Sequence, residues 1–122
     1  SMTKLDANPV ESQLAPWGKW EVLLDADYCK VKRIIVNPGH RLSYQKHFKR
    51  QEIWTVVQGE ATVVLNDETT VLSEGESIFI PKEAAHRVGN QGDKPLIFIE
   101  IQRGDYFGED DIIRLSDDYK RS

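Results

Sequence analysis

Four polar residues in the middle of the chain have the types and the spacing of a metal site. Gln45 and His47 are two residues apart, so in a strand both side chains project from the same face. Glu52 follows shortly after His47, and His86 arrives from a distant part of the chain. Imidazole, carboxylate and amide groups are ligands for Zn²⁺, Co²⁺, Mn²⁺, Fe²⁺ or Ni²⁺. The spacing therefore predicts one divalent metal ion, held by these four side chains.

The alternative is that these residues are unrelated polar groups on exposed strand faces. The second half of the region argues against it, because it repeats the organisation of the first. Gly75 and Pro81 bracket a short apolar run, and Asn90 follows His86. Turn residues at matching positions in the two halves favour a pocket built by neighbouring strands.

The elements that must position this site are short strands. Runs of β-branched and aromatic residues alternate with Gly, Pro and Asn turn signals, which is typical of an all-β sandwich or barrel. The predicted strands cover Arg33–Val36, Trp54–Val57, Ala61–Leu65, Thr69–Leu72, Ser77–Ile80 and Leu96–Ile101. Near the C-terminus, acids precede an apolar pair in the stretch Glu109–Arg114, which predicts a short helix. The acidic residues there form either a solvated helix end or a segment that closes over the barrel mouth.

Length and composition limit the functions open to this chain. Its 122 residues, 39% hydrophobic and 30% charged, are typical of one globular domain. A net charge of −4 argues against a nucleic-acid partner. No apolar run approaches the roughly 20 residues that cross a bilayer, so no membrane partner is expected. Cys29 is the single cysteine, which excludes an internal disulfide and favours a reducing compartment, with the cytoplasm as the default.

We expect two parts along the chain. Residues 1–15 are polar and predict an N-terminal arm, which opens on Ser1-Met2, a pair typical of an expression remnant. Residues 16–122 predict the folded domain. The opening residues do not have the pattern of a signal peptide.

The two halves of the predicted site resemble the two motifs of the cupin superfamily. The first reads Gly39-x5-Gln45-x-His47-x4-Glu52-x6-Gly59, with Gln45 where most cupins have a His. The second reads Gly75-x5-Pro81-x-Glu83-x2-His86-x3-Asn90. Within the cupins, the chain is similar to the type II mannose-6-phosphate isomerase domain, through Pro16-Trp17-Gly18, Arg50-x-Glu52-x-Trp54 and the tail Gly108-Glu109-Asp110-Asp111.

This resemblance implies a single-domain cupin jelly-roll β-barrel with a metal at its centre. It implies a metal-dependent aldose–ketose isomerase that interconverts mannose 6-phosphate and fructose 6-phosphate through a cis-enediol(ate). In many relatives the domain lies C-terminal to a mannose-1-phosphate guanylyltransferase. Here we expect it to be free-standing, because no Gly-rich nucleotide-binding loop precedes Pro16. By the same resemblance we expect a homodimer with a small-molecule sugar phosphate as its ligand.

An isomerisation of this kind needs an electrophile and a base. A divalent ion serves as the electrophile by holding two sugar oxygens. The base must titrate near neutrality, and Glu100 and Lys46 are both candidates. Glu52 can act as the base only if the metal does not use it.

Cationic and aromatic neighbours of the ligands are the candidates for substrate binding. Arg50 and Arg87 each lie near a ligand position, and guanidinium groups match phosphate oxygens in pairs. The further basic candidates are Lys32, Arg33, Arg103 and Arg114, and the alternative for each of them is a solvated surface charge. Trp54 shares the strand face of Glu52, so it either stacks on a sugar ring or packs in the core.

Two departures from the family pattern keep other functions open. Ala15 stands where an Arg is usual, and Ile53 replaces a His. A non-catalytic metal-binding or sugar-binding cupin is therefore the second hypothesis. A cupin dioxygenase is the third, and Gln45 in place of a His makes it less natural.

Overall fold

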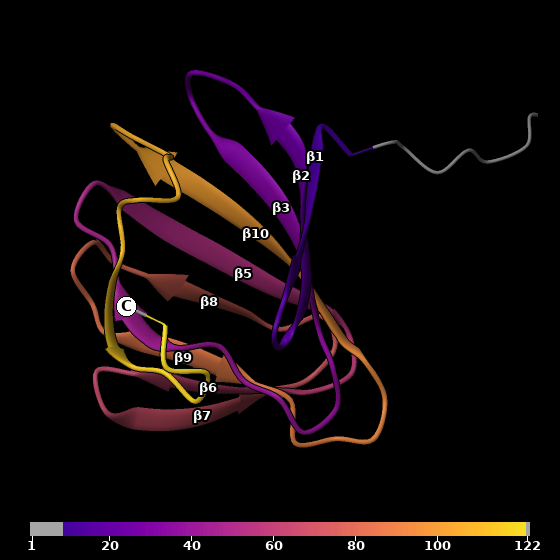
Figure 1. Cartoon of the computed structure of the whole chain (residues 1–122). Helices are drawn as coiled ribbons and strands as arrows, with labels where there is room; N and C mark the ends of the chain where they lie inside the picture. Colours follow the sequence, from indigo (N-terminus) through magenta and orange to yellow (C-terminus); the bar gives the residue numbers. More distant parts are fainter. Residues whose placement is uncertain (1–8, 122) are drawn as a thin grey trace, which may run out of the picture.

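The barrel consists of two antiparallel sheets that face each other. The computed structural model describes residues 9–121 (Figure 1). Its strands are β1 (Glu11–Ala15), β2 (Gly18–Asp25), β3 (Lys30–Val36), β4 (Tyr44–Lys46), β5 (Arg50–Gln58), β6 (Ala61–Leu65), β7 (Glu68–Leu72), β8 (Ser77–Ile80), β9 (His86–Gly89), β10 (Leu96–Gly104) and β11 (Ile113–Ser116). All six strands predicted from the sequence are confirmed, several with longer bounds.

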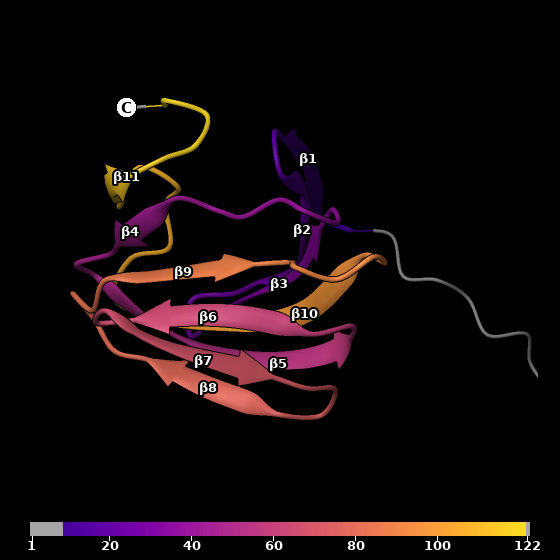
Figure 2. The same cartoon turned by 90° about the horizontal axis from the view of Figure 1, so that it is seen from below.

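The strand order is that of a jelly roll, because many neighbouring strands, such as β3 and β10 or β4 and β9, are distant in the sequence. The six-stranded sheet has the order β1-β2-β3-β10-β5-β8, and the five-stranded sheet has the order β11-β4-β9-β6-β7. Figures 1 and 2 show the two sheets as opposed layers. This confirms the all-β jelly-roll barrel. No helix in residues 9–121 is long and apolar enough to cross a membrane.

The inner face of the larger sheet is apolar at one end and polar at the other. Burial alternates along β3 and β5, as expected for strands with one face on the core. Pairing with β10 then stacks the inward residues in rows: Val36 with Leu96, Ile34 with Phe98 and Val56, Lys32 with Glu100 and Trp54, and Lys30 with Gln102 and Glu52. The rows that contain Val36 and Ile34 belong to the hydrophobic core. The rows that contain Lys32 and Lys30 supply the buried polar groups of the barrel mouth.

Tight turns join the strands at the places that the sequence marks. Asn66 and Asp67 both have positive φ angles, of 48° and 68°, between β6 and β7. Asn and Asp tolerate this conformation, and a two-residue turn of this hand matches the twist of a hairpin. The hairpin fixes the register in which Leu65 pairs with Glu68.

The C-terminal segment differs from its prediction. The expected helix over Glu109–Arg114 is absent; a turn ends at Asp111 and β11 begins at Ile113. Ile113 and Arg114 pair with Lys46 and Gln45 of β4, and this sheet edge outweighs the weak local preference for helix. Figure 2 shows β11 beside β4.

The N-terminal arm also belongs in part to the sheet. Glu11–Ala15 form the edge strand β1, which pairs with β2 from Glu11↔Val22 to Ala15↔Gly18. Residues 1–8 of the expected arm, with Ser1-Met2, lie outside the described residues. Cys29 is half-buried, so it is not the core residue that its type favours.

A substitution at Gly104 tests whether the end of β10 must lie close to the start of β5. Its φ of +153° is unfavourable for other residues, and a Cβ there would lie 2.2 Å from the carbonyl oxygen of Lys49. We expect Gly104→Ala to lower the free energy of unfolding by more than about 1 kcal/mol, measured by urea denaturation. The control is Gly39→Ala: φ is +78°, but no atom lies within 4 Å of the added Cβ, so only backbone strain is introduced. Equal losses in both variants would contradict the close approach.

Candidate metal centre

Three buried side chains from three parts of the chain converge at the barrel mouth. Glu52 faces inward from β5, His86 begins β9, and His47 lies in the loop between β4 and β5. One ligand atom from each residue can be chosen so that all three lie within 4.8 Å of one another. The structure therefore brings together three of the four predicted ligands.

Both imidazole rings are oriented by backbone carbonyl groups. Nδ1 of His47 lies 2.6 Å from the carbonyl oxygen of Asp111, and Nδ1 of His86 lies 2.9 Å from that of Ala84. A carbonyl oxygen only accepts, so each Nδ1 carries the hydrogen and each Nε2 keeps its lone pair. Metal-binding histidines are commonly held in this way.

An unsatisfied nitrogen supports the fit to a metal. Nε2 of His86 is buried and has no hydrogen-bond partner among the described residues. Nε2 of His47 lies 3.3 Å from Oε2 of Glu52. Two imidazole nitrogens and a carboxylate oxygen are a donor set for Zn²⁺ and similar divalent ions, so these three residues fit the expected metal.

Gln45, the fourth predicted ligand, lies beside the site in a different role. Its Oε1 accepts a hydrogen bond from Ser43 at 2.7 Å, and its Nε2 lies 3.5 Å from Nε2 of His47. The amide oxygen is thus held by Ser43, and the NH₂ group is the part nearest to His47. In this orientation Gln45 does not offer an oxygen alongside the three converging atoms.

The carboxylate of Glu52 is surrounded by donors. Arg50 donates from Nε to Oε2 at 2.8 Å, and Trp54 donates from Nε1 to Oε1 at 2.9 Å. Burial alone would raise the pKa of Glu52, but Arg50, together with the neighbouring His86 and His47, outweighs it and holds this pKa below its usual range. Glu52 is therefore ionised and available to a cation.

Glu100 is the second buried carboxyl group and has the opposite tendency. Trp54 also donates to its Oε1 at 3.1 Å, and Gln102 donates to its Oε2 at 2.7 Å. Burial, followed by the negative charge of Glu52, raises the pKa of Glu100. The neutral acid is thus favoured beside an ionised neighbour, which makes Glu100 a hydrogen-bond donor at the mouth.

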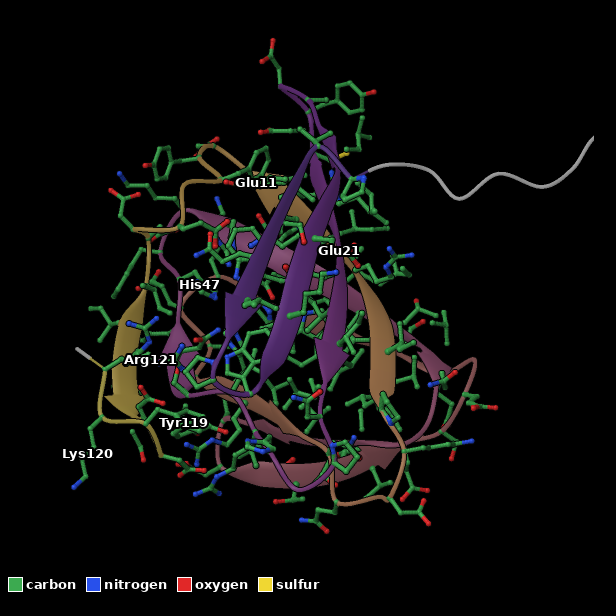
Figure 3. All side chains as sticks on the ribbon, turned by 45° about the vertical axis from the view of Figure 1, so that its right-hand side comes forward. Glu11, Glu21, His47, Tyr119, Lys120 and Arg121 are labelled. Atoms are coloured by element: carbon green, nitrogen blue, oxygen red, sulfur yellow. The ribbon has the colours of Figure 1, made fainter. Side chains whose placement is uncertain are left out.

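A cavity that His47 lines adjoins this centre and opens to solvent, and its wall is rich in cations. Lys32, Arg50, Arg114 and Arg121 line it together with the carboxyl groups of Glu100 and Glu109. Lys32 also lies 4.2 Å from the centroid of a Trp20 ring. Figure 3 shows Arg121 on the same side of the barrel as His47. A cationic cavity in a chain of net charge −4 favours an anionic ligand.

The acidic segment after β10 closes over the mouth, one of the two arrangements left open by the sequence. The carboxylate of Asp111 accepts hydrogen bonds from the backbone N–H groups of Phe48 and Lys49, at 3.0 and 2.9 Å. Glu109 forms ion pairs with Lys30 and Lys32, at 3.0 and 2.7 Å. Figure 1 shows this segment crossing from the end of β10 toward the other sheet.

Two predicted site residues lie elsewhere. Arg87 follows the inward-facing His86 on β9, so it points outward; its Nε donates to the carbonyl oxygen of Leu42, and it lines a separate cavity. Lys46 alternates with Gln45 in the same way, and its Nζ lies 5.3 Å from the centroid of the Phe48 ring. Neither residue lines the cavity beside the metal centre, so the geometry does not support their expected roles as phosphate clamp and base.

Trp54 belongs to the core. It is 3% exposed, its ring packs against Phe98 at 5.1 Å between centroids, and it does not line the cavity. Its contribution to the site is the indole N–H between Glu52 and Glu100. Stacking on a sugar ring is therefore not its role in this structure.

Several site residues were not found from the sequence. Lys30 is one of them: it continues the inward phase of Lys32, Ile34 and Val36, and this period-two pattern could have shown that both lysines are buried. Asp111 and Arg121 come from the C-terminal segment. No local signal in the sequence relates them to His47.

Comparison with known proteins gives the family. The family described as "Mannose-6-phosphate isomerase C-terminal" matches residues 6–117. The chain belongs to this family. It is 48% identical over 86% of its length to the mannose-1-phosphate guanylyltransferase of Sinorhizobium fredii, and 47% identical over 88% to the alginate biosynthesis protein AlgA of Pseudomonas aeruginosa. It spans 20% and 22% of those proteins, so it corresponds to about a fifth of each relative.

Solved structures agree on the fold. The capsular polysaccharide assembling protein CapF from Staphylococcus aureus superposes with a TM-score of 0.76 at 22% identity, over 89% of this chain and 33% of that one. The oxalate decarboxylase of Lactobacillus farciminis superposes with a TM-score of 0.75 at 25% identity, over 86% of this chain and 33% of that one. The shared architecture hosts different activities.

The comparisons correct the function expected from the sequence. The relatives are named for guanylyl transfer to mannose 1-phosphate, and none of these names supports the interconversion of mannose 6-phosphate and fructose 6-phosphate. The resemblance to the family is confirmed, but the isomerisation that we expected from it is not the reaction for which these relatives are named. What they share with this chain is the family of the matched domain; the enzyme names belong to the full-length relatives.

The buried His47 makes the stability of the metal-free protein depend on pH. Burial lowers the pKa of His47 from 6.5 to about 4, so between these values the unfolded chain binds a proton that the folded chain refuses. Its contribution to stability is therefore complete above about pH 6.5 and is lost as the pH falls, by at most about 1.4 kcal/mol for each pH unit. Urea denaturation in chelator should give a shallower pH slope for His47→Gln than for the parent. Parallel slopes would show that His47 is not buried in its neutral form.

Proposed function

We propose that the domain binds a divalent metal ion and, in the cavity above it, an anionic ligand of the sugar-phosphate class. The observation that carries this proposal is that three metal-binding side chains converge and that one of them, His47, also lines a cationic cavity. The relatives' names support a ligand related to mannose phosphates. The proposal is one of binding and does not include an aldose–ketose isomerisation.

Each group at the mouth has a role in such a complex. His47, His86 and Glu52 hold the ion, which supplies a Lewis acid for oxygen atoms of the ligand. Lys32 and Arg121 place positive charge on the cavity wall, where a phosphate group is stabilised. Glu100, as a neutral acid, donates a hydrogen bond to a hydroxyl or carbonyl oxygen. Trp17 and Trp20 add an apolar wall against which a sugar ring can pack.

The metal and the assembly expected from the sequence stay predictions. Zn²⁺, Co²⁺, Mn²⁺, Fe²⁺ and Ni²⁺ all accept the nitrogen and oxygen donors of this site. The homodimer and the cytoplasmic location are likewise proposals, and both apply to a chain that spans only a fifth of its relatives.

Metal content tests the assignment of ligands. Protein purified without chelator should contain close to one divalent ion for each chain, and His47→Ala/His86→Ala should lose it because both imidazole donors are removed. His40→Ala is the control, since Nδ1 of His40 bonds to the hydroxyl of Tyr119 and His40 does not line the metal cavity. Elemental analysis of the three proteins gives the answer. Equal metal in the double variant and the parent would place the ion elsewhere.

Ligand binding tests the second part of the proposal. In calorimetric titration, the zinc-loaded protein should bind mannose 1-phosphate and bind mannose far more weakly. Lys32→Met should weaken the phosphate ligand by about tenfold, because it removes one charge from the cavity wall. Arg87→Met removes a cation outside this cavity and should leave the affinity unchanged. No binding of mannose 1-phosphate, mannose 6-phosphate or fructose 6-phosphate by zinc-loaded protein would overturn a sugar-phosphate site.

A further inference from the structure

Arg50 lies where it contacts two of the three metal-binding groups. It is two residues from Glu52 on β5, so both side chains project to the inside of the barrel. The side chain is 5% exposed. Its Nε lies 2.8 Å from Oε2 of Glu52, and its Nη2 lies 3.3 Å from Nε2 of His47.

A divalent ion would require the same atoms. A metal bonds to imidazole nitrogen and carboxylate oxygen at about 2.0–2.2 Å, using the lone pairs that face Arg50 here. An ion bound to both groups would therefore lie within a few ångströms of a guanidinium that cannot lose its charge. The single lone pair of Nε2 in His47 cannot serve a metal ion and Arg50 at once, and two cations held close together at Oε2 of Glu52 repel each other.

Glu52 nevertheless needs a positive partner when no metal is bound. Its side chain is 2% exposed, and an ionised carboxylate that is buried without a partner is strongly destabilising. The N–H of Trp54 is a neutral donor and supplies no charge. His47 also lies beside Glu52, but burial favours its neutral form, so Arg50 is the one permanently charged side chain paired with Glu52 among the described residues.

We propose that Arg50 is an internal counter-cation that a divalent ion must displace from Glu52. Arg50 therefore stabilises the metal-free barrel and, for the same reason, lowers the affinity of the site for metal. The inference rests on the metal site proposed above. Arg50 also lines the cavity, so the released guanidinium is positioned to contact an anionic ligand there.

Removal of Arg50 should raise the affinity of the site for metal, although Arg50 lies within the site. Competition with a chromophoric chelator should show that Arg50→Met binds Zn²⁺ at least about tenfold more tightly than the parent. Arg50→Lys keeps the charge but loses the planar fork, so it should fall between them. Arg87→Met is the matched control and should bind Zn²⁺ like the parent. In chelator, Arg50→Met should unfold at a lower urea concentration, and Zn²⁺ should stabilise it more than it stabilises the parent.

The outcomes separate this inference from the proposed function. A parent protein that binds no divalent ion overturns the metal site itself. A parent that binds Zn²⁺ as tightly as Arg50→Met, or more tightly, overturns only the role of Arg50.

A measurement on the parent protein covers the case in which Arg50→Met does not fold. The ¹⁵N–¹H signal of the Arg50 side-chain Nε, assigned by its loss in Arg50→Lys, reports the bond to Glu52. Saturating Zn²⁺ should shift this signal and speed its exchange with water, since the hydrogen bond to Oε2 is broken. An unchanged signal at full occupancy would show that the ion and Arg50 share Glu52, and the inference would be wrong.

Discussion

The ionised carboxylate of Glu52, buried inside the barrel, is the constraint on which the site depends. A charge at this depth is tolerated only with donors on every side, and β5 supplies two of them itself through Arg50 and Trp54. The alternation of β5 places all three residues on one face, so the strand that carries the charge also carries its compensation. Glu100 favours its neutral form, because burial disfavours a second carboxylate here and the charge of Glu52 would repel it.

The barrel interior therefore has an apolar part, the core, and a polar part, the mouth, and both are built from the same strands. The same three strands contribute Val36, Phe98 and Val56 to the core and Lys32, Glu100 and Glu52 to the mouth. The apolar rows provide the packing that holds the strands in register. The polar rows depend on that register, because a shift of one residue would turn every charged side chain to the opposite face.

The strands and the central ligands were predictable because their signals are local. Runs such as Ala61–Leu65 predict a strand. The spacing of His47 and Glu52, within two halves that have Gly and Pro at matching positions, predicts a metal site. The C-terminal stretch was misjudged because its acids favour a helix locally, whereas β4 offers it a partner strand from far away in the sequence. The outward direction of Arg87 follows from simple alternation with His86, and adjacency in sequence was mistaken for adjacency in space.

The hydrogen bond from His47 to Asp111 has a consequence for the order in which the molecule matures. The two residues are 64 positions apart, and the carbonyl that orients the ring comes later in the sequence than all three metal-binding side chains. A nascent chain can expose these side chains before Asp111 has been synthesised, but the ring of His47 then lacks the acceptor that selects its tautomer. The orientation of the metal site is therefore completed only when the segment that contains Asp111 has folded against the barrel.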